Sequence, residues 1–149
     1  MEYLFYFIVF NISIYNIGLL WFILGLVKSK KNNFNENNLD VSIIVCVKNG
    51  ELSLPYILKD LHTQVYSSNI EFIIVDNNSS DKTKKIIQDF SSRDERFKYA
   101  HSSSGSENLK YKKRALDAGI ILSKYDILLF TDVDCRVSEN WASSMINNF

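Results

Sequence analysis

A run of twenty-five residues without a charged side chain, from residue 3 to residue 27, constrains this chain more than any other feature. At about 1.5 Å per residue, a helix of this length spans the hydrocarbon core of a bilayer. A secretory signal peptide would begin with basic residues and carry a shorter apolar stretch, whereas Glu2 precedes this run. The run therefore predicts a transmembrane helix. An unusually long buried helix of a soluble protein is the alternative.

The charges that flank this helix predict its orientation. Lys28, Lys30 and Lys31 follow the run directly, and the positive-inside rule keeps such residues on the cytoplasmic side. We therefore expect a single-pass membrane protein whose globular part is cytoplasmic. Residues 28 to 40 are polar and rich in asparagine, which is typical of a short flexible tether.

Charge and cysteine content exclude several classes of function. Seventeen Lys and Arg residues balance seventeen Asp and Glu residues, so no bulk charge would attract a nucleic acid. Cys46 and Cys135 have neither the spacing of metal ligands nor the density of a disulfide scaffold. We expect two free thiols in a reducing compartment, packed close together if their two segments are neighbours.

Beyond residue 40, apolar runs alternate with helical periodicities. The runs VSIIVCV and EFIIVD are nearly continuous, as in strands that are buried on both faces. Runs of this kind predict strands at 41 to 47, 71 to 76, 97 to 100 and 126 to 134. Apolar spacing predicts helices at 54 to 65, 79 to 90 and 109 to 123, and a last one after Ser138. This order predicts an α/β fold, a mainly parallel sheet with helices on both faces, spanning residues 41 to 149.

Single residues refine the helical part of this prediction. Ser53 is a candidate cap for the helix at 54 to 65, and Asp81 is expected in the first turn of the helix at 79 to 90. The last helix is expected to face inward through Trp141, Met145 and Phe149.

In such a sheet, ligands bind at the carboxyl ends of the strands. The candidate residues at those ends are Val47, Lys48, Asn49, Asp76, Asp132 and Asp134. Asp132 and Asp134 stand two residues apart as an apolar strand ends, so they point to the same side. Two carboxylates offer hard oxygen ligands for Mg²⁺ or Mn²⁺, and such a cation would stabilise a departing nucleoside diphosphate.

Four segments resemble, in this order and at these separations, the start of family 2 glycosyltransferases of the A-type fold: VSIIVCVKNG, EFIIVDNNSSDKT, YKKRALDAGI and ILLFTDVD. The resemblance covers about residues 40 to 149. It implies a transferase that uses a nucleotide-sugar donor, with a uridine nucleotide expected. It also implies that Val47, Lys48 and Asn49 approach the base and ribose, and that Asp76 accepts a hydrogen bond from the base.

The same resemblance implies where the diphosphate and the metal bind. Lys112 would lie near the diphosphate, Asp132 would contact the ribose or a metal-bound water, and Asp134 would coordinate the metal directly. The chain departs from the family pattern at Tyr111, where the family usually has glycine, and at Asp117, where an asparagine is common.

Sugar transfer with inversion needs a general base, which this family takes from a carboxylate beyond the D-x-D segment. We expect that base beyond residue 149, so this chain is expected to be the donor-binding N-terminal part of a longer enzyme. By itself it should bind donor weakly and transfer no sugar, and its acceptor is unknown. The strand at 126 to 134 should then expose an edge and an apolar face.

Three other functions compete with this hypothesis. A truncated membrane protein that at most holds nucleotide is the non-catalytic alternative. A haloacid-dehalogenase-type phosphatase also carries a D-x-D pair after an apolar strand, but on its first strand, and here the pair comes last. A dinucleotide-binding oxidoreductase would carry G-x-G-x-x-G after its first strand, which this chain does not.

Overall fold

The computed structural model describes residues 2–29 and 39–147 of the chain, and the side chains of residues 2–25 and 39–147. Contacts within the chain divide it into two compact units, Met1–Asn35 and Glu36–Phe149. The tether expected at 28 to 40 lies mostly outside the described residues.

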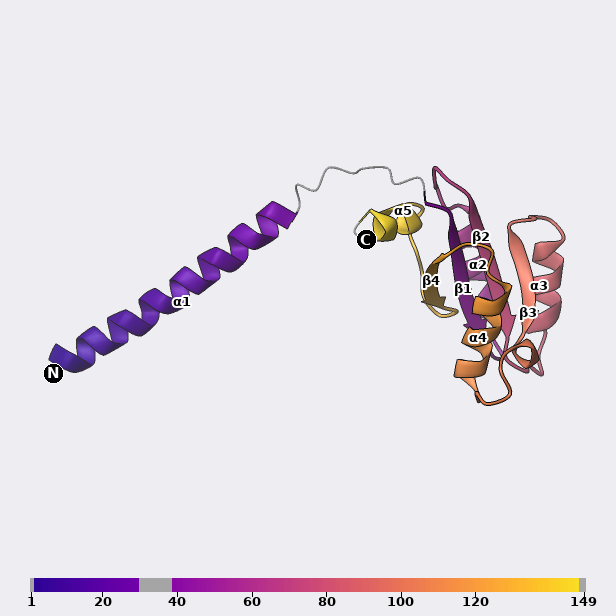
Figure 1. Cartoon of the computed structure of the whole chain (residues 1–149), viewed down its shortest axis with the longest axis horizontal. Helices are drawn as coiled ribbons and strands as arrows, with labels where there is room; N and C mark the ends of the chain where they lie inside the picture. Colours follow the sequence, from indigo (N-terminus) through magenta and orange to yellow (C-terminus); the bar gives the residue numbers. More distant parts are fainter. Residues whose placement is uncertain (1, 30–38, 148–149) are drawn as a thin grey trace. The chain divides into compact units, whose positions relative to one another are not determined.

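The first unit contains helix α1, Glu2–Ser29 (Figure 1). Its residues Glu2–Gly25 form an apolar span of 24 residues, so by length and composition it can cross a membrane. Asn11 donates a side-chain hydrogen bond to the carbonyl of Phe7, four residues back. A polar side chain of this kind satisfies its donor within its own helix, which apolar surroundings favour.

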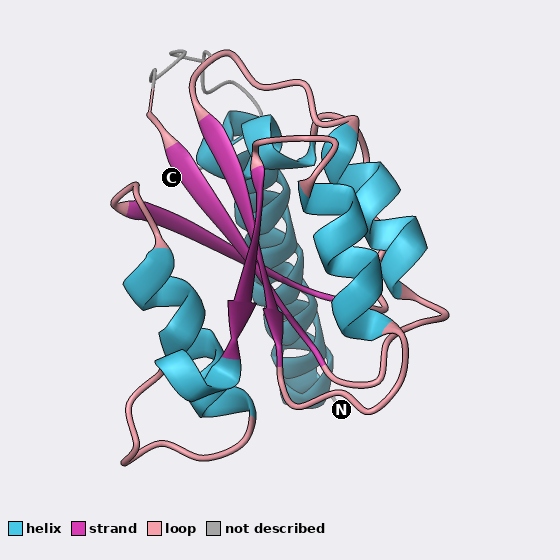
Figure 2. Cartoon of the chain, turned by 90° about the vertical axis from the view of Figure 1, so that its right-hand side faces the viewer, coloured by secondary structure: helices cyan, strands magenta, loops and turns pink. Residues whose placement is uncertain are grey.

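The second unit is built on a four-stranded sheet in which all pairs of neighbouring strands are parallel (Figure 2). The strands are β1 (Val41–Val47), β2 (Ile70–Asp76), β3 (Phe97–His101) and β4 (Ile127–Asp132), in the order β3-β2-β1-β4. The β-branched runs form the two central strands because both of their faces are covered. This confirms the α/β fold with a parallel sheet.

Helices cover both faces of this sheet. They are α2 (Leu54–His62), α3 (Thr83–Ser91), the short 3-10 helix η1 (Ser102–Ser104), α4 (Lys112–Leu122) and α5 (Trp141–Ile146). The core on one face includes side chains of α2, α3 and α5, and the core on the other face includes side chains of α4. The helices therefore lie on both sides of the sheet, as the alternating pattern predicted.

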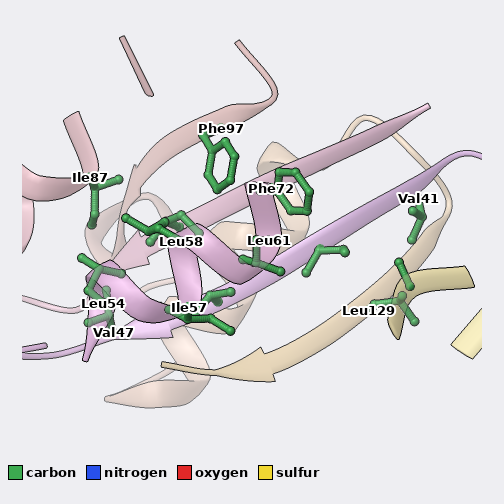
Figure 3. Packing of buried hydrophobic residues seen from close by; sticks show 14 of the residues in the cluster. Val41, Val47, Leu54, Ile57, Leu58, Leu61, Phe72, Ile87, Phe97 and Leu129 are labelled. Atoms are coloured by element: carbon green, nitrogen blue, oxygen red, sulfur yellow. The ribbon is translucent and has the colours of Figure 1, made fainter. Parts of the chain in front are cut away.

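The two faces are covered unequally. Beneath α2, Leu58, Phe72 and their neighbours are fully buried (Figure 3), and burial of one such side chain contributes about 2 kcal/mol. On the other face, Gly119 lets α4 approach β1 closely, since a Cβ there would lie 2.6 Å from Ile44 Cγ2. Phe130 of β4 nevertheless stays 47% exposed on that face. The apolar exposure expected along this strand is present.

Several local predictions were wrong. Ser53 stands at the start of α2, but its side chain makes no capping hydrogen bond. Helix α2, predicted at 54 to 65, ends at His62. In α5 the fully buried side chains are Ala142 and Ile146, while Met145 is half exposed. The expected inward position of residue 149 lies outside the described residues.

Candidate functional site

The carboxyl ends of three strands bring the acidic candidates to one edge of the sheet. Val47 stands opposite Asp76 in the register of β1 and β2, and Cys46 stands opposite Asp132 in the register of β1 and β4. Because both pairings are parallel, Asp76 and Asp132 lie at the same edge and not at opposite ends. The convergence on which the sequence hypothesis depends is therefore present.

A hollow of about 350 Å³ lies at this edge. Its lining is Cys46, Val47, Lys48, Asn77, Lys112, Asp132, Val133 and Asp134. Five predicted site residues are thus brought together, namely Val47, Lys48, Lys112, Asp132 and Asp134. Asn49 and Asp76 are not in this lining. Asn77 also follows the second strand in the sequence but was given no role, because an asparagine after a strand is also an ordinary turn residue.

One ion pair crosses this hollow. Lys112 Nζ donates to Asp132 Oδ1 at 2.5 Å, and both side chains are more than half exposed. The hydrogen bond that Lys112 donates to Asp132 is the main cause that raises the pKa of Lys112, and the charge of Asp134 adds to it. An exposed pair of this kind contributes less than about 1 kcal/mol to stability. Both charges can therefore exchange partners at low cost when a ligand enters.

Asp134 is exposed, and within the described part of the chain its side chain makes no hydrogen bond or ion pair. It stands in a turn directly after β4, in which the amide of Cys135 donates to the carbonyl of Asp132 at 3.2 Å. A carboxylate with no protein partner, next to one held by a lysine, is well suited to an incoming cation.

Both cysteines are free thiols. Cys46 is half buried, and burial raises its pKa to about 11, so the thiol is neutral at physiological pH. A protonated thiol is a weak nucleophile, and Cys46 therefore serves as part of the wall of the hollow. Cys135 is exposed and lines a different hollow, beside Leu52 and Tyr56.

Asp76 and Asn49 are engaged by the backbone of the loop that follows β2. Asp76 is 2% exposed, and its Oδ1 accepts a hydrogen bond from the amide of Ser79 at 2.9 Å. Asn49 Oδ1 accepts from the amide of Ser80 at 2.8 Å. Each of these two side chains is thus held by the loop after β2, and their contact with a base stays a prediction.

The loop after β1 is tied to the loop after β2 by further hydrogen bonds. The amide of Gly50 donates to Thr83 Oγ1 at 2.8 Å, and the amide of Glu51 donates to Asp81 Oδ2 at 3.0 Å. Asp81 also accepts from the amide of Thr83, where α3 begins. The expectation that Asp81 lies inside the first turn was wrong, because its carboxylate joins the two loops and the helix starts after it.

Strained backbone gathers around the same edge. Among the described residues, the three non-glycine residues with positive φ are Asn49 at 51°, Asn78 at 56° and Tyr111 at 55°. Asparagine tolerates this region, but a tyrosine pays a cost of about 1 kcal/mol or more. Tyr111 stands directly before α4, where the family pattern has glycine, and so directly before Lys112.

The carboxylates fit a cation that is shared with a phosphate ligand. Within the residues that the structure describes, no group of three or more His, Cys, Asp and Glu side chains could hold a metal alone. Magnesium-like sites often use one or two carboxylates together with substrate phosphates. Asp132 and Asp134 supply that smaller donor set.

Solved structures share this fold. S. aureus TarS 1–349 in complex with UDP-GlcNAc matches with a TM-score of 0.57 and 21% identity, over 72% of this chain and 30% of that one. The mannosyltransferase PcManGT from Pyrobaculum calidifontis, in complex with GDP-Man and Mn²⁺, matches with a TM-score of 0.60 and 17% identity, over 87% of this chain and 38% of that one. At these identities the likeness concerns the fold.

Sequence comparison leads further. The chain is 27% identical over 121 residues to the 4,4'-diaponeurosporenoate glycosyltransferase of Staphylococcus haemolyticus (strain JCSC1435), a match that covers 81% of this chain and 31% of that protein. The chain therefore spans about three tenths of the length of that curated relative. Residues 42–149 match the model described as glycosyl transferase family 2. This match extends over more than half of the chain, which belongs to glycosyl transferase family 2.

Proposed function

We propose that this chain is the donor-binding part of a membrane-anchored glycosyltransferase that takes a sugar from a uridine diphosphate sugar, with the help of a divalent metal and with inversion at the anomeric carbon. The observation that carries the proposal is the gathering of Lys112, Asp132 and Asp134 around one hollow at the carboxyl edge of a parallel sheet. UDP-GlcNAc in TarS, a protein of the same fold, supports the choice of a uridine nucleotide.

The charges in the hollow suit a nucleoside diphosphate. Lys112 can turn from Asp132 to a phosphate oxygen, because the present pair is exposed. Asp132 and Asp134 are the residues that would hold Mn²⁺ or Mg²⁺, and a cation held there would supply positive charge to stabilise the departing diphosphate. Val47 and Lys48 line the same hollow, which supports the proposal that they contact the nucleoside.

Calorimetric titration of the detergent-solubilised protein tests donor binding. We expect UDP-sugars to bind more tightly with Mn²⁺ than without it, and Asp134→Ala to remove most of that difference. Asp89→Ala is the matched control. It removes an exposed carboxylate of α3, far from Asp134 in the sequence, and should behave as the parent. Equal binding by Asp134→Ala and the parent, with and without Mn²⁺, would exclude Asp134 as the metal ligand.

Membrane anchoring by α1 belongs to the same proposal, with the globular unit in the cytoplasm. Its support is the apolar span Glu2–Gly25 and the lysines at 28, 30 and 31. Cys135 is an exposed thiol in the globular unit and offers a test. In a Cys46→Ser background, a membrane-impermeant maleimide should label Cys135 in permeabilised cells and not in intact cells. Labelling of intact cells would place the globular unit outside and contradict the orientation.

A further inference from the structure

Two polar side chains near the end of α2 are almost completely buried, although neither lines the hollow at the sheet edge. Asp60 is 8% exposed and Gln64 is 7% exposed. Charged and amide side chains are rarely buried to this degree unless they are well paired. Most of their partners come from the segment 136–142, which begins two residues after Asp134.

Asp60 forms an ion pair and hydrogen bonds with the start of this segment. Its Oδ2 accepts from Arg136 Nε at 2.6 Å and its Oδ1 accepts from Arg136 Nη2 at 2.8 Å, which is the two-point geometry of the strongest carboxylate pairs. The amide of Val137 donates to the same carboxylate at 3.2 Å.

Gln64 and Val65 form hydrogen bonds with the rest of the segment, residues 138–142. Gln64 Nε2 donates to the carbonyl of Ser138 at 2.6 Å, and Gln64 Oε1 accepts from the amide of Ala142 at 2.9 Å. The amide of Val65 donates to the carbonyl of Glu139 at 2.8 Å. Asp60 and Gln64, together with the segment that they hold, are called the α2 latch below.

The α2 latch bears on Asp134 because of where the segment begins. Asp134 lies between two anchored points, the end of β4 at Asp132 and the gripped residue Arg136. With no hydrogen bond of its own among the described residues, the Asp134 side chain owes its position to these two points. A ligand site must hold its groups within a fraction of an ångström to bind well.

We propose that Asp60 and Gln64 are positioning residues that hold Asp134 in place to receive the metal and the donor diphosphate. This proposal rests on the proposed function of the same site. It assigns to the end of α2 a role in donor binding, although the helix contributes no group to the hollow. The competing explanation is that the α2 latch only secures α5 against the core.

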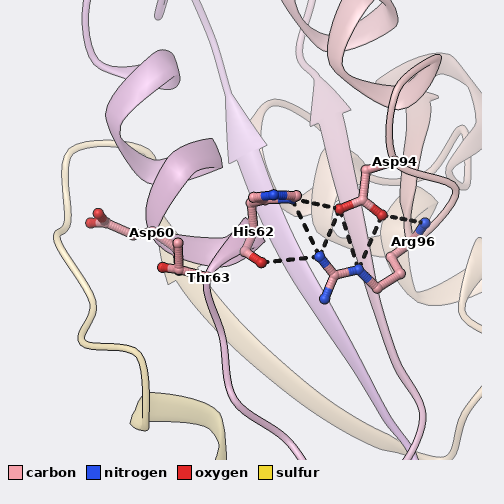
Figure 4. A network of polar contacts seen from close by, with 5 residues as sticks. All are labelled: Asp60, His62, Thr63, Asp94 and Arg96. Carbon is pink, nitrogen blue, oxygen red and sulfur yellow. Dashed lines mark hydrogen bonds and ion pairs between the residues drawn. The ribbon is translucent and has the colours of Figure 1, made fainter.

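A second arginine fork offers a matched control. Asp94 is 11% exposed at its side chain and accepts from Arg96 Nε and Arg96 Nη2 at 3.0 and 2.7 Å. It stands before β3, at the amino end of the sheet, and it also contacts His62 of α2 (Figure 4). Figure 4 shows Asp60 and His62 pointing to different sides of α2. Asp94→Asn therefore weakens a similar fork away from the hollow.

The experiment compares Asp60→Asn with Asp94→Asn in the full chain, at equal temperature and in the same detergent. The first readout is hydrogen exchange of the amides of residues 133–139 without ligand. We expect faster exchange there in Asp60→Asn and no change there in Asp94→Asn. The second readout is the affinity for UDP with and without Mn²⁺, which should fall about tenfold in Asp60→Asn with Mn²⁺ and stay within about twofold without it.

Each outcome decides the proposal. Arg136→Lys keeps the charge and should recover part of the affinity that Arg136→Gln loses, as positioning by the fork requires. Faster exchange with unchanged Mn²⁺-dependent affinity would leave the α2 latch a purely structural device and overturn the proposal. Equal losses in Asp60→Asn and Asp94→Asn would trace the effect to general destabilisation. The last outcome is a parent protein that binds neither UDP nor GDP with Mn²⁺, while exchange at residues 133–139 is still faster in Asp60→Asn than in the parent. That result would overturn the proposed function and with it the positioning role.

Discussion

The two ends of the four-stranded sheet hold carboxylates in opposite situations. At the amino end, Glu71 is 4% exposed and accepts hydrogen bonds from Ser42 Oγ at 2.6 Å, Lys98 Nζ at 2.6 Å and the amide of Lys124 at 2.7 Å. At the carboxyl end, Asp134 is exposed and makes no hydrogen bond within the described residues, and Asp132 has one exposed lysine.

This difference shows how one residue type serves two purposes. Burial alone would raise the pKa of Glu71, but its bonds with Lys98, Ser42 and Lys124 together lower it. Its charge is therefore satisfied by the protein and joins β1, β2 and β3 to the loop before β4. At the other end Asp76 is held by the protein, but the exposed Asp134 and the exposed pair of Asp132 leave oxygen atoms for a ligand, which is typical of sites built at the carboxyl ends of parallel strands.

The largest effect on stability is expected at the amino end. Glu71→Ala removes a buried acceptor and leaves Ser42, the amide of Lys124 and Lys98 without it, so the free energy of unfolding should fall by about 3 kcal/mol. Urea unfolding of the detergent-solubilised chain measures this. Glu95→Ala, which removes an exposed carboxylate near the same end, should change it by less than about 0.5 kcal/mol. A loss below about 1 kcal/mol for Glu71→Ala would remove the contrast between the two ends.

The pH dependence of stability should also report on the amino end. The hydrogen bond from Arg96 is the main cause that lowers the pKa of Asp94 from 3.8 to about 2. Its folded pKa lies below its unfolded value, so this contribution of about 2 kcal/mol is present above about pH 4 and is lost as pH falls toward 2.

Asp94→Asn checks this dependence. The variant should be less stable than the parent at neutral pH, and the gap between them should close as the solution is acidified through this range. Asp134→Asn is the comparison from the other end and should be as stable as the parent at neutral pH, because Asp134 is exposed and makes no hydrogen bond among the described residues. A constant gap between Asp94→Asn and the parent would show that the fork stabilises the fold without its charge.

A smaller effect, of opposite sign, is expected beside the hollow. Tyr111 has a positive φ of 55°, which glycine adopts without strain, so Tyr111→Gly should stabilise the chain by about 1 kcal/mol. Lys113→Gly, two residues later and inside α4, should destabilise it by a similar amount. Thermal unfolding of both variants measures these changes. A higher melting temperature for Tyr111→Gly would show that backbone strain beside the carboxyl edge lowers the stability of the parent.

The smallest effect on unfolding is expected for Lys112→Gln. The pair with Asp132 is exposed, so the free energy of unfolding should change by less than about 0.5 kcal/mol. The affinity for UDP should fall about tenfold, because a cation next to the diphosphate is lost. Lys113→Gln is the control for both quantities. If Lys112→Gln were as destabilising as Glu71→Ala, the carboxyl edge would be a structural network too.

Much of the fold could be predicted because its signals are local. The run 41 to 47 has a β-branched or apolar side chain at nearly every position, and such a run is stable only where both faces of a strand are covered. Helix ends were predicted less well. The start of α3 depends on Asp81, whose carboxylate is used by Glu51 from a distant loop, and no local pattern contains that contact.

The candidate site was predicted in part for the same reason. Asp132 and Asp134 stand where an apolar run ends. The rule that ligands bind at the carboxyl ends of parallel strands places them at the edge where the hollow lies. Asp60 and Gln64 looked like ordinary residues of a helix end, and their partners lie 74 to 78 residues away. The orientation of Asp76 toward Ser79 was equally invisible, because a loop conformation decided it.

The sequence by itself determined the apolar span at the N-terminus, the parallel α/β order and the edge at which the acidic strand ends meet, since hydrophobic periodicity acts over a few residues. Only the tertiary structure decided which carboxylates are satisfied by the protein and which are left for a ligand. The physical reason is that the energy of a charged group depends on its burial and on its hydrogen-bond partners, and at Glu71 and Asp60 those partners come from distant parts of the chain.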